Sequence, residues 1–388
     1  MDFDEKIDRR GTNCNKWDHM ERVYGVSPDD GIAMWVADSD FRPPACVQRA
    51  VQKITDHGVY GYGGDKDAYR QAVCWWMEHR HGWRPEPEMV FATSGLVNAV
   101  GLCLHSWSDP GDRVLVMSPH YHAFGRVVRG AQRELVELPL RVENDFDLDV
   151  HAWDAMMTGA EKILILCSPH NPTGRVWSRA ELMEIADFVR RHDLLLVSDE
   201  VHADLIYPGH SHAAMPLVDG VEDRLVVLHS ASKPFNLAGA YLGQAIIPDP
   251  KLRAVFAKTC LGLGISPNMF GVPMTTAAFS PEGAKWIDAQ MDYLDANRAA
   301  WEDGINALPG VRAVPLQATY LSWVDFRGTG MTQAEVNGRV YKDARIAAHA
   351  GTDFGLGGDG FMRFNIGTQR ANITEALSRL HDAFGDLQ

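Results

Sequence analysis

The sequence predicts an α/β protein, in which a mostly parallel central sheet lies between layers of helices, with a smaller α+β domain beside it. Three uninterrupted apolar runs carry this prediction: residues 163–166, 194–197 and 225–228. Such runs, separated by helical segments, are typical of parallel strands that are buried on both faces. The length of 388 residues exceeds the usual size of one domain, so two domains are expected.

The helices follow from amphipathic spacing and capping signals. Residues 65–81 place their apolar side chains on one face and predict a helix. Ser178 and Glu181 predict a capping box at the start of a helix that crosses between two of the apolar strands. After Pro281, a long helix should lead into a strand over residues 320–326.

The domain division follows from this order of elements. We expect residues 1–44 to form an N-terminal arm and part of the small domain, residues 45–285 the large domain, and residues 286–388 the C-terminal small domain. Small-molecule sites often lie where domains or subunits meet. The site is therefore expected between the two domains and at a subunit interface.

Composition excludes several classes of function. The net charge of −14 argues against a general binder of nucleic acid or of anionic membranes, which relies on basic patches. The six cysteines form no CxxC pair, which favours reduced thiols. No signal peptide is expected, and no apolar run reaches the roughly 18 residues of a membrane span. We expect a soluble, cytoplasmic protein.

Histidines are numerous but do not form a recognisable ligand motif. The sixteen histidines include His120, His122, His202, His210 and His212, without an HExxH motif or a comparable set. No metal site is therefore expected. Residues 202–212 should form a loop near the mouth of the substrate site, with His210 or His212 facing solvent.

The segment SASKPFNLAG, residues 230–239, is the most informative one. It places Lys233 behind two serine hydroxyls, just after the apolar run 225–228. In a partly desolvated cleft the charged form of a lysine is disfavoured, so its amine can act as a nucleophile. Enzymes that use pyridoxal phosphate present their Schiff-base lysine in this way. Alone, the segment would in most cases be a surface lysine in a serine-rich turn.

Two other strand ends offer partners for such a cofactor. Asp199 follows the run 194–197, and ligands of parallel sheets bind at the carboxyl ends of the strands. Paired with a protonated pyridine nitrogen, Asp199 would keep the ring an electron sink. Asn171, in CSPHNPTG, could donate its amide to the ring hydroxyl. Without Lys233, Asp199 could equally be a helix cap or a solvated acid, and most NPTG strings are simply turns.

A third turn suits a phosphate. In FATSGLVNAV, Ser94 and Gly95 lie between a predicted strand and a predicted helix. The free N–H groups at a helix start favour an anion. Half or more of such turns bind nothing, so this signal is weak alone.

In their order along the chain, the NPTG turn, the DEVH strand end and the Ser-x-Ser-Lys run resemble fold type I pyridoxal phosphate enzymes. Within that superfamily, the segments DFDEKIDRRGTNCNKWD, MWVADSDFRPP and HGVYGYGG resemble the MalY/PatB group of cystathionine β-lyases. MRFNIGT, with Arg363, completes a resemblance that covers about residues 3–368.

The resemblance implies a role for each candidate residue around the ring of pyridoxal 5′-phosphate. Lys233 should bind the cofactor covalently, and Asp199 should face the pyridine nitrogen. Asn171 and His202 should lie beside the ring hydroxyl, and Tyr121 should stack on the ring. Lys233, Asp199 and Tyr121 are the expected catalytic residues.

The resemblance also implies phosphate and substrate contacts. The expected phosphate contacts are Ser94, Gly95, Leu96, Ser230, Ser232 and, on the neighbouring subunit's phosphate, Tyr62. Arg363, with Asn171, should bind the α-carboxylate of the substrate. Sharing Tyr62 implies a homodimer. Tyr241 stands where many aminotransferases carry a phosphate-binding arginine, which favours the lyase group.

The resemblance implies α,β-elimination on cystathionine or a related L-cysteine S-conjugate, giving a thiol, pyruvate and ammonia. An aminotransferase of the same superfamily is the nearest alternative, because both reactions begin with removal of the α-proton. A regulator that retains the cofactor fold is a further alternative from another class.

Overall fold

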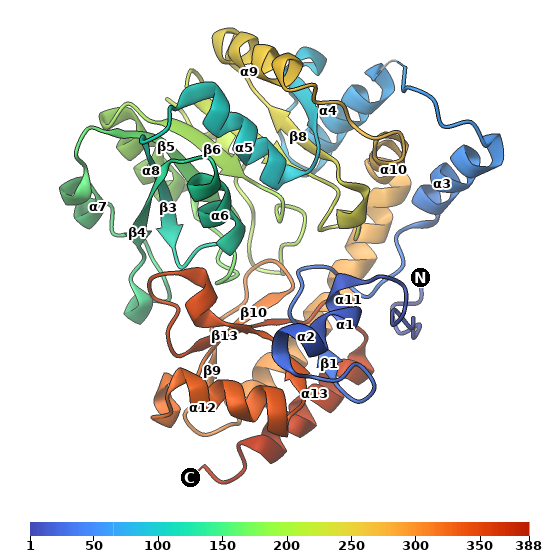
Figure 1. Cartoon of the computed structure of the whole chain (residues 1–388), viewed down its shortest axis with the longest axis vertical. Coiled ribbons are helices and arrows are strands. Elements are labelled where there is room, and N and C mark those ends of the chain that lie inside the picture. The colour runs from blue at the N-terminus through green and yellow to red at the C-terminus, as the bar shows by residue number, and fades with distance from the viewer. Residues whose placement is uncertain (65, 388) are drawn as a thin grey trace.

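The computed structural model describes residues 1–64 and 66–387 of the chain. A seven-stranded sheet forms the upper half of Figure 1, with the strand order β2-β8-β7-β6-β5-β3-β4. Its strands are β2 (Val90–Thr93), β3 (Arg113–Ser118), β4 (Glu134–Pro139), β5 (Glu161–Cys167), β6 (Leu195–Asp199), β7 (Leu225–His229) and β8 (Gly243–Ile246). The antiparallel pairings are those of β8 with β2 and with β7, and the other neighbouring strands pair in parallel. The expectation of a mostly parallel sheet is therefore confirmed.

Alternate side chains of the central strands enter two different hydrophobic clusters. In β5, Leu164 and Leu166 belong to the larger cluster, whereas Ile163 and Ile165 belong to a second one. This alternation follows from the two-residue repeat of a strand, and it explains why the runs are apolar at every position. Helices cover both faces (Figure 1).

Each face of the sheet is covered by its own set of helices. Residues of α5 (Leu96–Trp107), α6 (His122–Gly130) and α9 (Pro250–Gly262) belong to the second cluster. Residues of α4 (Asp67–His81), α7 (Val150–Met156) and α8 (Arg179–Arg191) belong to the larger one. Ser178 and Glu181 form the expected capping box of α8, which crosses from β5 to β6. For the helix predicted over residues 65–81, Asp65 lies outside the described residues.

A four-stranded sheet in the order β12-β13-β10-β9 forms the lower part of Figure 1. Its strands are β9 (Arg312–Ala313), β10 (Leu321–Asp325), β12 (His349–Ala350) and β13 (Phe361–Asn365). The neighbouring helices are α11 (Pro281–Asn306), α12 (Gln333–Gly338) and α13 (Arg370–Ala383). The domain boundary that we propose at residues 285 and 286 falls within the first turns of α11.

The N-terminal arm joins the C-terminal part of the chain. Strand β1 (Ile32–Ala33) pairs in parallel with β11 (Ile346–Ala347). The remaining α-helices are α1 (Asn15–Asp18), α2 (Met20–Tyr24), α3 (Ala45–His57) and α10 (Gly271–Ala278). Short 3-10 segments are η1 (Pro87–Met89), η2 (Val142–Asn144), η3 (Met215–Leu217), η4 (Ala238–Ala240), η5 (Arg327–Thr329) and η7 (Gly351–Phe354), and η6 (Arg339–Asp343) is a π-helix.

Within residues 1–64 and 66–387, no helix combines the length and the apolar composition needed to cross a membrane.

Candidate active site

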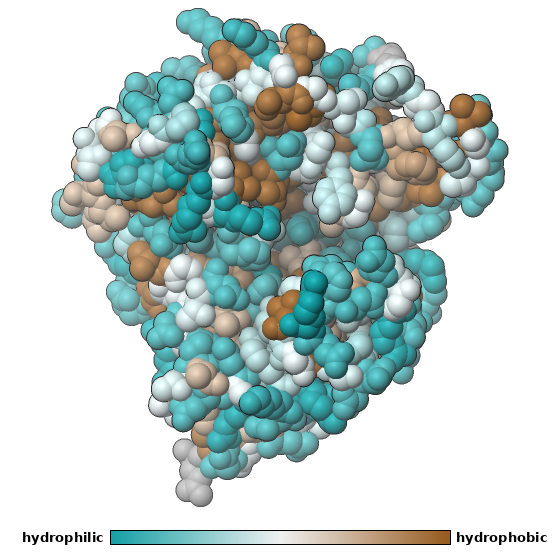
Figure 2. Space-filling view, viewed as in Figure 1, coloured by the Kyte–Doolittle hydropathy of each residue, from teal (hydrophilic) through white to brown (hydrophobic). Residues whose placement is uncertain are grey.

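A cavity of about 950 Å³ lies at the carboxyl ends of the parallel strands. This is the edge where ligands of parallel sheets bind. Figure 2 shows the surface hollowed where the upper part of the molecule, with the seven-stranded sheet, meets the lower part. Nine of the predicted site residues line the cavity: Ser94, Gly95, Leu96, Tyr121, Asn171, Asp199, His202, Ser232 and Lys233.

Lys233 lies in the turn after β7, and two serine contacts fix that turn. Ser230 Oγ donates to the carbonyl of Leu242 at 2.7 Å and accepts the N–H of Ser232 at 3.0 Å. Lys233 Nζ donates to the carbonyl of Ala37 at 2.7 Å. Burial lowers the pKa of Lys233 to about 8, against the opposing effect of Asp38. Its amine is therefore easier to deprotonate than that of an exposed lysine.

Asp199 ends β6 and lines the same cavity. Burial raises the pKa of its carboxyl to about 7, although the N–H of Val201 and the charge of Lys233 lower it. A cation beside the carboxyl would stabilise its charged form. The protonated nitrogen of a pyridine ring has that charge, so Asp199 fits the role expected from the sequence.

Asn171 and Arg363 are joined by a buried hydrogen bond. Arg363 Nη1 donates to Asn171 Oδ1 at 2.9 Å, and its Nη2 donates to the carbonyl of Trp35, also at 2.9 Å. Arg363 Nε is buried and has no hydrogen-bond partner among the described residues. Burial lowers the pKa of Arg363 to about 10, with Tyr121 acting in the opposite direction. The unpaired Nε is a donor that a substrate carboxylate could use.

Tyr121 and His202 contribute two rings to the wall. Tyr121 is the residue before α6, and burial raises the pKa of its hydroxyl. His202 is 1% exposed, and its Nδ1 has no hydrogen-bond partner among the described residues. Burial, together with Lys233 and Arg363, lowers the pKa of His202 well below its ordinary value, so its imidazole is neutral. A neutral imidazole suits a contact with the ring hydroxyl of a cofactor.

The start of α5 lies at one end of the cavity. Gly95, the residue before the helix, has φ of 86°, a conformation that glycine adopts more readily than other residues. Ser94, Gly95, Leu96 and Ser232 surround this end. The unsatisfied N–H groups and the dipole of the first turn favour a phosphate.

Three of the predicted site residues do not line the cavity: Ser230, Arg363 and Tyr62. Ser230 is fully buried and uses its hydroxyl to hold the lysine turn. Arg363 is 1% exposed and contacts the wall through Asn171. Tyr62 is fully exposed, so the structure does not bring it to this chain's own site.

Sequence reasoning gave no role to the N-terminal segment that forms the opposite wall. Residues 36–38 and 40–42 line the cavity, and Ala37 accepts the hydrogen bond from Lys233. Asn236 holds this segment by donating to the carbonyls of Ser39 and Phe41, at 2.8 and 3.0 Å. The segment MWVADSDFRPP indicated only the family resemblance. Its contact with Lys233 is made by a backbone carbonyl, which any residue type can provide, so no sequence pattern indicates it.

The residues present fit pyridoxal phosphate, because they combine an accessible amine, a buried acid, an unpaired neutral imidazole and an anion-binding helix start. Fold and cavity together define an α/β protein of the kind that binds this cofactor at the strand ends. The chain belongs to the aminotransferase class I and II family, which matches residues 34–380.

Comparison with individual proteins indicates which group within this family the chain resembles. The chain is similar to cystathionine beta-lyase PatB of Bacillus subtilis (strain 168), with 36% identity over 99% of this chain and 100% of the relative. It is 30% identical to protein MalY of Escherichia coli (strain K12), over 99% of this chain and 98% of the relative. Cystalysin from Treponema denticola, whose crystal structure contains pyridoxal 5′-phosphate, matches with a TM-score of 0.94 and 32% identity, over 100% of this chain and 99% of that chain. The expected resemblance to the MalY/PatB group is confirmed.

Proposed function

We propose that this protein is a pyridoxal phosphate-dependent carbon–sulfur β-lyase. It carries out α,β-elimination on cystathionine or a related L-cysteine S-conjugate and releases a thiol, pyruvate and ammonia. Its similarity to a cystathionine beta-lyase over the full length of both chains supports this activity. The observation that carries the proposal is the presence of Lys233 and Asp199 in one cavity, each with a pKa shifted by burial towards neutrality.

When bound, the cofactor supplies an aldehyde for the substrate amine and a ring that accepts negative charge from the α-carbon. Lys233 would hold the aldehyde through Nζ, and its amine is the base that would take the α-proton of the substrate. Its lowered pKa favours the neutral amine that this proton transfer needs. Asp199 would hold the proton on the ring nitrogen, and so keep the ring able to accept charge.

Asn171 and Arg363 orient the substrate and the ring. Because Asn171 Oδ1 already accepts a hydrogen bond from Arg363, its amide nitrogen is left to donate to the ring hydroxyl. Arg363 binds the α-carboxylate of the substrate with Nε as one of its donors, assisted by Asn171. Tyr121 would pack against the ring, and His202 would lie beside the ring hydroxyl.

The proposed assembly is a homodimer with shared active sites. Tyr62 is fully exposed, and its neighbours Val59 and Tyr60 are 65% and 58% exposed. Exposed aromatic side chains next to each other are typical of surfaces that become interfaces. In the dimer, Tyr62 donates its hydroxyl to the phosphate bound by the neighbouring subunit. The six free cysteines favour a cytoplasmic location.

Transamination is the second candidate, because the family also includes aminotransferases and both reactions use the same lysine and acid. Tyr241 favours the lyase, since it stands where many aminotransferases of this superfamily carry a phosphate-binding arginine. Its side chain is 68% exposed at the wall of the cavity.

Release of thiol from L-cystathionine tests the proposal. The cofactor-loaded protein should release free thiol continuously, and Lys233→Ala should abolish the release. A wild-type protein that binds the cofactor but releases no thiol from any S-substituted L-cysteine would overturn it.

A further inference from the structure

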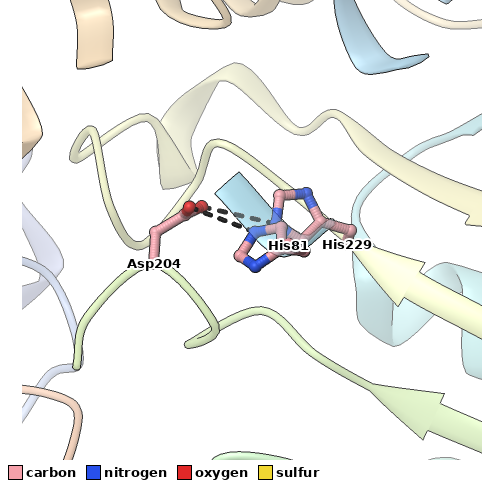
Figure 3. A group of neighbouring side chains, drawn as sticks. All are labelled: His81, Asp204 and His229. Carbon is pink, nitrogen blue, oxygen red and sulfur yellow. Dashed lines mark ion pairs between the residues drawn. The ribbon is translucent and has the colours of Figure 1, made fainter. Parts of the chain in front are cut away.

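Three side chains of the kinds that bind metal ions meet outside the cavity of Lys233. They are His81, the last residue of α4; Asp204, in the segment after β6; and His229, the last residue of β7. Their ligand atoms all lie within 4.8 Å of one another, and all three residues are buried. Figure 3 shows both imidazoles on one side of the Asp204 carboxylate, each with a nitrogen towards it.

The distances between the ligand atoms suit shared coordination of one ion. Nε2 of His81 lies 3.2 Å from Oδ1 of Asp204, and Nε2 of His229 lies 3.3 Å from Oδ2. Both nitrogens lie within ion-pair distance of the carboxylate, but neither makes a well-aligned hydrogen bond among the described residues. Two ligands of a tetrahedral Zn²⁺ ion are about 3.3 Å apart, because each bond is about 2.0–2.1 Å long. Buried polar nitrogens without a well-aligned hydrogen bond cost free energy that a bound ion would offset.

The surroundings also resemble those of a metal site. Trp76 Nε1 donates to both carboxylate oxygens of Asp204, each at 3.1 Å. Such a bond from outside the ligand set orients a metal-binding carboxylate. Arg80 Nε lies 3.8 Å from Asp204, but Arg80 forms its shorter ion pair, of 2.7 Å, with Asp288.

Two of the three residues, His81 and Asp204, adjoin a second cavity. This cavity, of about 490 Å³, is also lined by the exposed residues His79 and His210. We propose that His81, Asp204 and His229 bind a divalent transition metal ion of the Zn²⁺ class, with water as the fourth ligand. Two imidazoles and one carboxylate are a donor set that suits Zn²⁺. The ion would tie the end of α4 to the strand that precedes Lys233, and this site does not depend on the lyase reaction.

The test is direct titration of the cofactor-loaded protein with Zn²⁺ after treatment with a chelator, followed by calorimetry and by metal analysis after dialysis. One Zn²⁺ per chain is expected. Replacement of Zn²⁺ by Co²⁺ should give the visible absorption of a tetrahedral site. His229→Gln and His81→Gln should each weaken binding by more than the roughly 10- to 100-fold that loss of an outer partner costs. His210→Gln, the same change on the same cavity, should leave binding unchanged.

Several results would overturn the site. Whether an ion binds is decided by titration of the wild type alone. The proposal therefore remains testable even if a variant fails to fold. Absence of stoichiometric Zn²⁺ binding to the wild type would refute it. Binding that survives in both His81→Gln and His229→Gln, or that is lost in His210→Gln, would place the ion elsewhere. Zn²⁺ should also raise the melting temperature of the wild type and of His210→Gln, but not of His81→Gln.

Discussion

Replacing Asp40 with asparagine should destabilise the protein strongly, because Asp40 neutralises a lysine that has no access to water. Lys16 is 0% exposed, and its Nζ lies 2.8 Å from Asp40 Oδ2. The other carboxylate oxygen accepts from Arg9 Nη1 at 2.8 Å and from Trp17 Nε1 at 3.2 Å. Asp40 belongs to the segment whose Ala37 carbonyl accepts the bond from Lys233, so this network also supports one wall of the active site.

The size of the effect follows from what Lys16 retains. Removal of one partner of a buried ion pair costs about 3–5 kcal/mol, mostly because the other charge is left uncompensated. In Asp40→Asn, Lys16 keeps the carbonyl of Asp38 at 3.2 Å and Asp38 Oδ1 at 3.8 Å. The asparagine also preserves the shape of the side chain. We therefore expect a loss at the lower end, about 3 kcal/mol of the free energy of unfolding.

Urea unfolding followed by circular dichroism measures this loss at pH 7. The matched control is Asp8→Asn in the same arm, because Asp8 pairs with Arg10 on the surface, where both side chains are about half exposed. Exposed pairs contribute little, so the control should unfold at the same urea concentration as the wild type. A loss below about 1 kcal/mol in Asp40→Asn would refute the reasoning, since it would mean that Lys16 is not an uncompensated buried charge.

The effect should also depend on pH in a defined direction. Burial raises the pKa of Asp40, but Lys16 and Arg9 outweigh burial and leave the pKa below its ordinary value. A carboxyl with a lowered folded-state pKa contributes stability that is complete above the unfolded pKa, about 3.9, and is lost as the pH falls through the folded value. The difference between the wild type and Asp40→Asn should therefore be constant near neutral pH and shrink below about pH 4.

Three further predictions concern the active site. Lys233→Ala should leave no cofactor covalently fixed after borohydride reduction, as measured by mass spectrometry, whereas the exposed Lys258→Ala should behave as the wild type. Tyr62→Phe should weaken cofactor retention by about 10- to 100-fold, since a hydrogen bond to a charged group contributes about 1.5–3 kcal/mol, and Tyr60→Phe should not. A fully active monomer in sedimentation would contradict the shared site. Arg363→Ala should raise KM for the substrate by at least about tenfold, because it removes hydrogen bonds to the charged α-carboxylate. An unchanged KM would show that Arg363 does not bind the substrate.

The parts that the sequence predicted well carry local signals. The apolar runs of β5, β6 and β7 identified the buried strands, since only strands covered on both faces are apolar at every position. The carboxyl ends of parallel strands meet at one edge of a sheet, so Asp199 and Lys233 could be placed in one site before the structure was known.

The parts that the sequence did not predict depend on contacts between distant segments. Ser230, which is expected at the phosphate, donates its hydroxyl to the carbonyl of Leu242, a contact that no motif encodes. No ligand motif is present in the sequence, and no metal site was expected from it. His81, Asp204 and His229 are separated by 123 and 25 residues (204 − 81 and 229 − 204), so spacing rules cannot detect a cluster that forms when α4 packs against the sheet.

The central claim is that the site eliminates a thiol from an S-substituted L-cysteine and is ready for another turnover without a second substrate. The most direct measurement is the yield of pyruvate and thiol from L-cystathionine, per active site, with no added keto acid. We predict equal amounts of pyruvate and thiol, rising through many turnovers. Turnover that stops after about one equivalent per site, and resumes only when a keto acid is supplied and without free thiol, would show an aminotransferase and contradict the claim.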